Sequence, residues 1–262
     1  MKAGPPTLRR AIVRPPGPSY AEGLTTAGLG PPDLERALAQ HAAYCDALER
    51  LGLALIRLDP DPFHPDSTFV EDAAVLTPRG AVLTLPGAPS RRGEIAGIRP
   101  AIEPFFPAPR EIAAPGTLDG GDVCDAGDRV FVGVSSRTNA EGARQLAAIL
   151  GGWGIPVTGV DIRGAAALLH LKSGLASLGP GLLAVDSTLA DHPAFRAYDL
   201  VRVSEVERYA ANCVRVNEAV LVAEGFPEFA AALAARGLAV QPIAMSEFEK
   251  MDGGLSCLSL RF

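Results

Sequence analysis

The chain has 262 residues, of which 48% are hydrophobic and 21% are charged, and its formal net charge at pH 7 is −6. A chain of this size can bury a full core, as one large domain or two small ones. The acidic balance, without a basic block, argues against nucleic acid and against an anionic membrane as partners, and no apolar run approaches the roughly 18 residues of a membrane span.

Cysteine usage and the first residues indicate the compartment. The 4 cysteines are too few and too scattered for a disulfide framework, and none has the CxxC spacing of many zinc sites. The first residues lack the apolar core of a secretory signal. We therefore expect a reduced, cytoplasmic protein of enzyme size that uses no metal and no cofactor.

The predicted elements repeat one order along the chain. A strand over 11–13 is followed by a helix over 32–51, where apolar side chains recur every three or four residues behind Asp33, and then by a strand over 53–58. Each later unit has a hairpin, a helix and a strand. The hairpins are expected at 68–76 with 81–85, 122–124 with 130–134, 168–171 with 182–185, and 213–216 with 219–222. The helices are expected at 94–106, 139–150, 193–198 and 228–236, and the strands at 111–113, 156–160, 200–203 and 239–243.

This unit recurs about every 45 to 50 residues, a period in the range of repeat architectures. A last strand is expected over 255–260, and it would pair most simply with the strand over 11–13. Closing the array in this way removes exposed sheet edges and favours a ring. The sequence thus predicts an α/β fold of repeated hairpin-helix-strand units in a single domain over residues 1–262, with one central mouth.

Chemistry-bearing residues lie beside the predicted strand ends. Cys257 follows the pair Gly253-Gly254 in an apolar run, and His170 ends another apolar run. Carboxylates are placed at 71–72 and at 119–122. A thiolate is a good nucleophile at neutral pH, and imidazole titrates near neutrality. One thiol, one imidazole and several semi-buried acids together predict a cysteine nucleophile that acts on a cation.

Seven short motifs, within a match that runs from about Arg10 to Phe262, resemble those of the dimethylarginine dimethylaminohydrolases. They are FVED at 69–72, PGAPSRR at 86–92, LDGGD at 118–122, RTN at 137–139, HLKS at 170–173, ANC at 211–213 and MDGGLSC at 251–257. The resemblance implies the five-bladed α/β propeller of guanidino-group-modifying enzymes, which agrees with the repeat described above. It also implies hydrolysis of Nω,Nω-dimethyl-L-arginine and Nω-monomethyl-L-arginine to L-citrulline plus dimethylamine or methylamine, and a homodimer.

The expected reaction gives each candidate catalytic residue a role. Cys257 attacks the guanidinium carbon and forms a covalent S-alkylthiouronium, which water then hydrolyses. His170 supplies a proton to the leaving amine and then acts as base, and Asp119 orients His170. Asp72, with Glu71 beside it, holds the guanidinium, whose pKa stays above about 12. Neighbours in a strand face opposite ways, so both acids can serve one face only if a turn or bulge falls there.

The resemblance also implies the residues that bind the amino-acid end of the substrate. Arg91 and Arg137 match the arginines that bind the α-carboxylate, a task suited to bidentate guanidinium forks. Asp66 matches the acid near the α-amino group. Leu24 and Met251 match positions that contribute main-chain carbonyls, and Leu24 lies in an expected lid loop of small residues.

Several conspicuous residues keep a structural interpretation. The other cysteines are expected in the core. Lys172 is expected as a surface charge, and Asp122, beside a glycine, fits a turn as well as a substrate loop. Asp119 stands where some bacterial relatives carry a glutamate, so its reach toward His170 is one methylene shorter.

Two other functions fit parts of this pattern. An arginine deiminase-like hydrolase would use the same thiol, imidazole and acids but release ammonia from arginine or a related guanidine. Those enzymes look longer, with an inserted helical domain for which this chain has no room. A non-catalytic propeller binding protein would not need these groups at one mouth. The preference between mono- and dimethylarginine, the exclusion of arginine and inhibition by a metal at Cys257 are left open.

Overall fold

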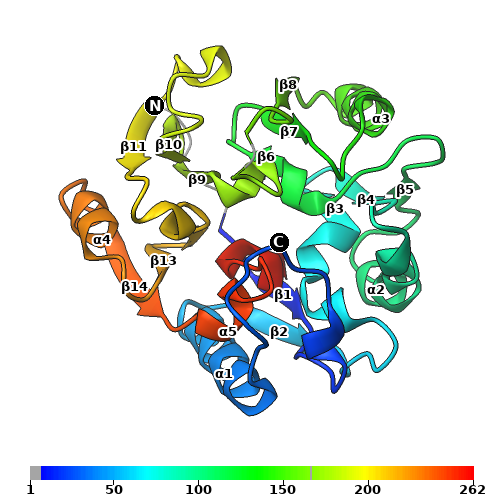
Figure 1. The fold of residues 1–262 in the computed structure, drawn as a ribbon. Helices are drawn as coiled ribbons and strands as arrows, with labels where there is room; N and C mark the ends of the chain where they lie inside the picture. The colour runs from blue at the N-terminus through cyan, green and yellow to red at the C-terminus, as the bar shows by residue number, and fades with distance from the viewer. Residues whose placement is uncertain (1–6, 166) are drawn as a thin grey trace.

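Three-stranded sheets form a ring about a central axis in the computed structural model, which describes residues 7–165 and 167–262 (Figure 1). In each sheet the middle strand pairs antiparallel with the inner strand and parallel with the outer strand. From inner to outer strand, the five sheets are β15 (Leu260–Arg261), β1 (Arg10–Val13) and β2 (Ala54–Arg57); β3 (Ala74–Thr77), β4 (Gly80–Leu83) and β5 (Arg110–Glu111); β6 (Val123–Asp125), β7 (Val130–Val134) and β8 (Val157–Asp161); β9 (Leu175–Gly179), β10 (Leu182–Asp186) and β11 (Asp199–Val203); β12 (Val214–Val216), β13 (Ala219–Ala223) and β14 (Ala239–Ile243). This arrangement confirms the predicted α/β fold class with its pseudo-fivefold repeat.

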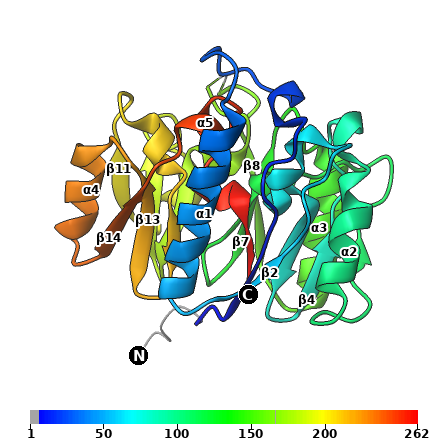
Figure 2. The ribbon, with the colours of Figure 1, turned by 90° about the horizontal axis from the view of Figure 1, so that it is seen from below.

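Helices cover the outside of the ring (Figures 1 and 2). The outer helices are α1 (Leu34–Arg50), α2 (Glu94–Ile102), α3 (Ala140–Gly152) and α4 (Pro227–Ala234), and the short α5 (Ser246–Glu249) leads into the last segment. Asp33 and Asn139 cap α1 and α3, because their side chains accept the backbone N–H groups of Arg36 and Gly142. Within the part of the chain that the structure describes, no helix is long and apolar enough to cross a membrane.

The ring closes where the two ends of the chain pair. β1 lies between β15 and β2, with Ala11 opposite Arg261 and Ile12 opposite Leu260 in an antiparallel register. A hydrogen bond of 2.6 Å between the hydroxyls of Tyr44 in α1 and Ser259 ties the helix to the approach of β15. The predicted pairing of the last strand with the first is therefore confirmed.

Several segments expected as regular elements are 3₁₀ turns instead. The strand expected from residue 68 begins only at Ala74, and the strand expected at 168–171 is absent among the described residues, since β9 begins at Leu175. The strand expected over 255–260 is a turn followed by β15, and the helix expected at 193–198 is the single turn Pro193–Phe195. A short buried apolar run does not distinguish a strand from a buried turn, so these expectations were wrong.

A 3₁₀ turn leads into each inner strand, and the turns meet at the centre of the ring. We call them the acid turn (Val70–Ala73), the glycine turn (Gly120–Asp122), the histidine turn (Leu171–Ser173), the bridging turn (Arg208–Ala211) and the nucleophile turn (Leu255–Leu258). The nucleophile, acid, glycine, histidine and bridging turns pack against one another in this order. Residues far apart in the sequence are thereby collected at one place.

Candidate active site

His170 and Asp119 form a buried pair. The Nε2 atom of His170 lies 3.0 Å from Oδ2 of Asp119, so the shorter acid reaches the imidazole directly. The other Asp119 oxygen accepts the backbone N–H of Gly87 at 2.8 Å. Burial would lower the pKa of His170, but the charge of Asp72 and the hydrogen bond to Asp119 outweigh it and raise this pKa to about 9. His170 is therefore a cation at neutral pH, ready to donate a proton.

Cys257 lies in the nucleophile turn and is half-buried. Its Sγ accepts the backbone N–H of Gly254 at 3.4 Å. Burial raises the pKa of the thiol to about 12, and the charges of Glu71 and Asp72 act in the same direction. The thiol is consequently protonated at neutral pH in the free protein.

Asp72 is a buried carboxylate held on both oxygens. Oδ1 accepts the N–H of Gly121 at 2.8 Å, and Oδ2 lies 2.5 Å from the guanidinium of Arg91. Burial would raise the pKa of Asp72, but His170 and Arg91 outweigh it and lower this pKa to about 2. Asp72 is therefore ionised throughout the physiological range.

The glycine turn can approach these groups only because it has no side chain there. A Cβ on Gly121 would lie 2.8 Å from Oδ1 of Asp72 and 2.9 Å from the ring of His170. Both distances are shorter than normal contacts, so any larger residue would displace the acid or the imidazole. The glycines of the LDGGD motif thus serve close packing of the site.

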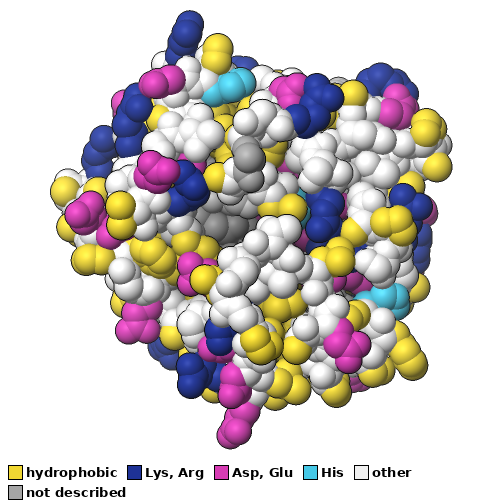
Figure 3. All heavy atoms as spheres, viewed as in Figure 1, with side chains coloured by type: hydrophobic (Ala, Val, Ile, Leu, Met, Phe, Trp, Pro, Cys, Tyr) yellow, Lys and Arg dark blue, Asp and Glu magenta, His cyan; other side chains and the backbone are white. Residues whose placement is uncertain are grey.

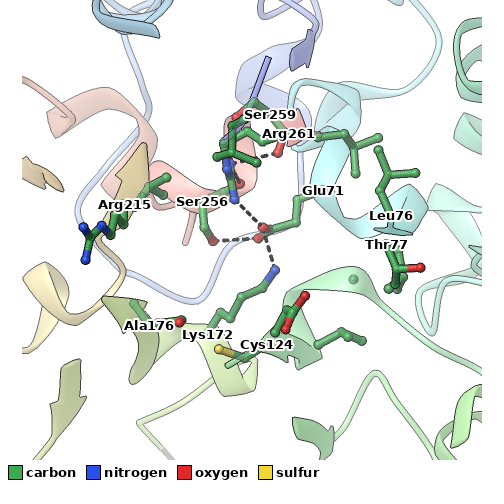
Figure 4. Close-up of a pocket in the computed structure, with 18 of the residues that line it drawn as sticks. Glu71, Leu76, Thr77, Cys124, Lys172, Ala176, Arg215, Ser256, Ser259 and Arg261 are labelled. Atoms are coloured by element: carbon green, nitrogen blue, oxygen red, sulfur yellow. Dashed lines mark hydrogen bonds and ion pairs between the residues drawn. The ribbon is translucent and has the colours of Figure 1, made fainter. Parts of the chain in front are cut away.

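Glu71, whose partners are drawn in Figure 4, has a different environment from Asp72. Its carboxylate accepts the hydroxyl of Ser256 at 2.6 Å and lies 2.6 Å from the Lys172 ammonium and 3.5 Å from the Arg261 guanidinium. Glu71, Lys172 and Arg261 line a cavity of about 610 Å³ among the inner strands. The two adjacent acids therefore have separate partners, and Asp72 is the one beside His170 and Asp119.

Lys172 corrects a sequence expectation. It was expected as a surface charge, but its side chain is only 15% exposed and pairs with Glu71. Its position two residues after His170, inside the HLKS motif, is the signal that could have placed it near the site. Lys172 and Ser256 are thus neighbours of the site that sequence reasoning did not assign.

Arg91 is buried and its guanidinium is held mainly by acids. Nε and one terminal nitrogen donate to the two oxygens of Glu94 at 2.9 and 2.8 Å, and the other terminal nitrogen donates to Asp72. Further donation goes to the carbonyls of Asp66 and Phe69. Arg91 thus links the acid turn to the start of α2 in this structure.

The other residues expected at the amino-acid end lie around Asp66. The Asp66 carboxylate is buried and accepts the N–H of Leu24 at 3.1 Å. A Cβ on Gly23 would lie 2.5 Å from Asp66 and 3.0 Å from the side chain of Met251, so these positions adjoin one another. The guanidinium of Arg137 lies 3.9 Å from Asp119, and its charge also acts to lower the pKa of Asp66, which burial raises.

The segment around Leu24 crosses the end of the ring opposite the C-terminus (Figure 2). Its Thr26 donates through both N–H and hydroxyl to Oδ2 of Asp252, at 2.5 and 2.9 Å, and Thr25 donates to the carbonyl of Lys250 at 2.7 Å. Thr26 and Asp252 line a second cavity, of about 640 Å³. On the face shown in Figure 3, basic and acidic side chains are interspersed rather than gathered by sign.

Asp122 is a structural tie. It is fully buried and accepts the hydroxyl of Ser135 at 2.6 Å and the backbone N–H of Leu171 at 2.9 Å. Leu171 directly follows His170, so Asp122 holds the backbone that carries the imidazole. Of the two interpretations left open, this geometry favours the turn.

One group of residues in the described part of the chain could ligate a metal ion. Asp72, Asp119 and His170 are all buried, and one ligand atom from each lies within 4.8 Å of the others. The imidazole must lose its proton before it can ligate a metal, so the raised pKa of His170 opposes metal binding at neutral pH.

Known proteins are similar to this chain in both sequence and fold. No protein-family model matches the chain. The chain is 43% identical over 256 residues to the N(G),N(G)-dimethylarginine dimethylaminohydrolase of Pseudomonas aeruginosa, which covers 97% of this chain and 100% of that relative. It is 38% identical over 262 residues to the Streptomyces coelicolor protein of the same name, covering 97% and 96%. A solved P. aeruginosa structure, a cysteine-to-serine mutant complexed with citrulline, has a TM-score of 0.95 at 42% identity, covering 98% of this chain and 100% of that chain.

Proposed function

The chain belongs to the dimethylarginine dimethylaminohydrolase family, and we propose that it hydrolyses Nω,Nω-dimethyl-L-arginine and Nω-monomethyl-L-arginine to L-citrulline plus dimethylamine or methylamine. The observation that carries the proposal is the buried cluster of Asp72, Asp119 and protonated His170 at the centre of the ring, with the turn of Cys257 packed against the acid turn. This cluster joins a cation site to a nucleophile and a proton donor.

The charges of the site make the reactivity of the Cys257 thiol depend on bound substrate. The pKa of Cys257 is raised by burial and then by Glu71 and Asp72, so the resting thiol is unreactive. A guanidinium bound at Asp72 brings a positive charge beside the thiol and offsets those two carboxylates. The thiol pKa then falls, and the thiolate forms where an electrophile is already in place.

The reaction follows from these groups. The thiol proton passes to water, and the thiolate attacks the guanidinium carbon to form a tetrahedral adduct. His170 gives its proton to the methylated nitrogen, and the C–N bond breaks to release the amine. The remaining S-alkylthiouronium is attacked by water, from which the now neutral His170 takes a proton. Collapse of this second adduct breaks the C–S bond, leaving citrulline and Cys257.

The amino-acid end of the substrate is bound by the residues around the lid. Arg137, whose side chain is 18% exposed and whose guanidinium lies 3.9 Å from Asp119, is our choice for direct binding of the α-carboxylate. Arg91 adds positive charge from its place on Asp72 and Glu94. The α-ammonium is assigned to Asp66, with main-chain carbonyls of Leu24 and Met251 as further partners.

The test is citrulline release by the purified protein from dimethylarginine, monomethylarginine, arginine and agmatine, each offered alone. We expect release from the two methylated amino acids and none with Cys257→Ser. Turnover of arginine in their place would move the chain to the arginine deiminase-like alternative. A Cys257→Ser protein as active as the wild type would overturn the mechanism.

The cytoplasmic location, the homodimer and the absence of nucleic acid as a partner remain predictions. They are checked by cell fractionation, by analytical ultracentrifugation of the purified protein, and by its ratio of absorbance at 260 and 280 nm after purification.

A further inference from the structure

The ring of turns has one junction that the proposed reaction leaves unexplained, between the histidine turn and the nucleophile turn. The bridging turn fills this place, and Asn212 directly follows it. At this junction and at two others, a side chain in or directly after one turn accepts the backbone N–H of the next turn. The pairs are Asp72 with Gly121 at 2.8 Å, Asp122 with Leu171 at 2.9 Å, and Asn212 with Ser256 at 2.8 Å.

Asn212 differs from the two aspartates because it also donates. Its Oδ1 accepts the N–H of Ser256, and its Nδ2 donates to the carbonyl of Lys172 at 3.0 Å. Ser256 directly precedes Cys257, and Lys172 lies two residues after His170. One buried side chain thus holds the nucleophile turn and the histidine turn at a fixed separation.

Only an amide satisfies both partners. A carboxylate could accept the N–H of Ser256 but would place a second acceptor against the Lys172 carbonyl. An amide turned by 180° would place its NH₂ donor against the Ser256 N–H and its oxygen against the Lys172 carbonyl. A neutral side chain also adds no negative charge beside Cys257, whose thiol already lies near Glu71 and Asp72. The residue type at this junction therefore follows from its two partners.

The same contact explains Gly254 in the MDGGLSC motif. A Cβ on Gly254 would lie 2.4 Å from Cγ and 2.6 Å from Oδ1 of Asn212. Beside it, the hydroxyl of Tyr209 in the bridging turn donates to the carbonyl of Gly253 at 2.8 Å. Tyr209 and Asn212 thus hydrogen-bond the backbone at Gly253 and at Ser256, just before the nucleophile.

We propose that Asn212 is a positioning residue, which sets the place of the Cys257 thiol relative to the His170 imidazole by joining the turns that carry them. This inference rests on the function proposed above. Asn212 is not assigned any contact with the substrate, so its loss should affect the chemical step more than substrate binding.

The experiment compares Asn212→Ala and Asn212→Asp with Asn217→Ala as a matched control. Asn217, in the turn between β12 and β13, also bridges two segments, since Oδ1 accepts from Leu8 at 2.9 Å and Nδ2 donates to the carbonyl of Leu51 at 2.8 Å. Its backbone has a φ of 50°, so alanine there is strained and should destabilise the fold at least as much. The measurements are the thermal midpoint, kcat and KM with dimethylarginine, and the rate of Cys257 alkylation by iodoacetamide against pH without substrate, with the modified site identified by mass spectrometry.

The two Asn212 variants should shift the alkylation profile in opposite directions. In Asn212→Ala the released turn exposes the thiol to water, so its alkylation midpoint moves to lower pH, while kcat falls about 100-fold, the effect expected of a misplacement near 1 Å. In Asn212→Asp the added carboxylate moves the midpoint to higher pH. KM should change little in Asn212→Ala, and Asn217→Ala should lower the thermal midpoint while leaving kcat and the alkylation profile as in the wild type.

Two results would overturn the proposal: an Asn212→Ala protein with wild-type kcat, or an Asn217→Ala protein that reproduces the loss of kcat and the shifted profile. The alkylation measurements need no substrate. If the wild type released citrulline from no methylated arginine, the proposed function would fail, while the pH profiles would still decide whether Asn212 positions Cys257.

Discussion

Asp72 and Arg91 form a buried ion pair, with 2.5 Å between a carboxylate oxygen and a guanidinium nitrogen. The acid that we assign to the substrate cation is therefore already in contact with a cation of the protein. Glu94 binds the other edge of the same guanidinium at 2.8 Å. The substrate guanidinium would share Asp72 with Arg91, and the pair keeps Asp72 ionised before any substrate arrives.

Removing Arg91 alone should destabilise the fold more than removing the charges of Arg91 and Glu94 together. Arg91→Met leaves Glu94 as a buried acid without its cation and leaves Asp72 with only the His170 cation beside it, so we expect the free energy of unfolding to fall by about 3 to 5 kcal/mol. Adding Glu94→Gln removes one of these charges and should restore part of the loss. Urea denaturation of both variants measures the difference, and a double variant no more stable than Arg91→Met would contradict this account.

His170 should make stability depend on pH in the alkaline range. Its pKa is raised from 6.5 to about 9 in the folded protein, so its contribution is complete below pH 6.5 and is lost as the pH rises through about 9. A shift of this size corresponds to at most about 3 kcal/mol. The free energy of unfolding, measured between pH 6 and pH 10, should fall with rising pH for the wild type and change less for His170→Gln. Parallel curves for the two proteins would show that the imidazole is not the titrating group.

Asp119→Asn separates the charge of Asp119 from its shape. Burial lowers the pKa of His170, and the hydrogen bond to Asp119 is, after the charge of Asp72, the main contribution that raises it. The amide should therefore lower the pKa of His170 and move the alkaline limb of kcat/KM to lower pH. The pH–rate profile for dimethylarginine checks this, and an unmoved alkaline limb would assign the limb to another group.

Asp252 should hold the lid through Thr26. Asp252→Ala removes the acceptor of both Thr26 hydrogen bonds and, at a φ of 56°, also strains the backbone. The segment should therefore open more often, and KM for dimethylarginine should rise several-fold, on the order of 3 to 10. Asp191→Ala is the control, since the Asp191 side chain is 90% exposed and forms an ion pair with Arg202. Limited proteolysis should cut the 23–30 segment faster in Asp252→Ala, and equal KM values in the two variants would rule out the latch.

The sequence predicted the repeated units and the closure of the ring, because these depend on local periodicity and on the avoidance of open edges. It did not predict that the chemistry-bearing segments are turns, since a buried apolar run has the same composition in either form. The partners of Glu71 and Arg91 also escaped it. Glu94 lies only three residues after Arg91, a spacing that is visible in the sequence. Lys172 reaches Glu71 only after the units close, because no spacing in one sequence encodes a contact between separate turns.

The candidate site residues were assigned from the motifs and from chemical reasoning. The structure places His170 against Asp119 and Asp72 beside both, and it gives the two adjacent acids different partners. Asn212 lies in the ANC motif, but the sequence alone indicates no role for it. Its amide becomes informative only in the folded structure, where it contacts an acceptor in the histidine turn and a donor in the nucleophile turn.

Closure of the ring also gives the thiol a different support from that of the acids and the imidazole. The nucleophile turn runs into β15, and β15 is held by β1, from the other end of the chain. The acids and the imidazole come from the middle units, whereas the sulfur is carried by the segment that pairs with the first strand. Loss of either terminal strand would therefore leave the acids and the imidazole in units that are still present but remove the support of the thiol.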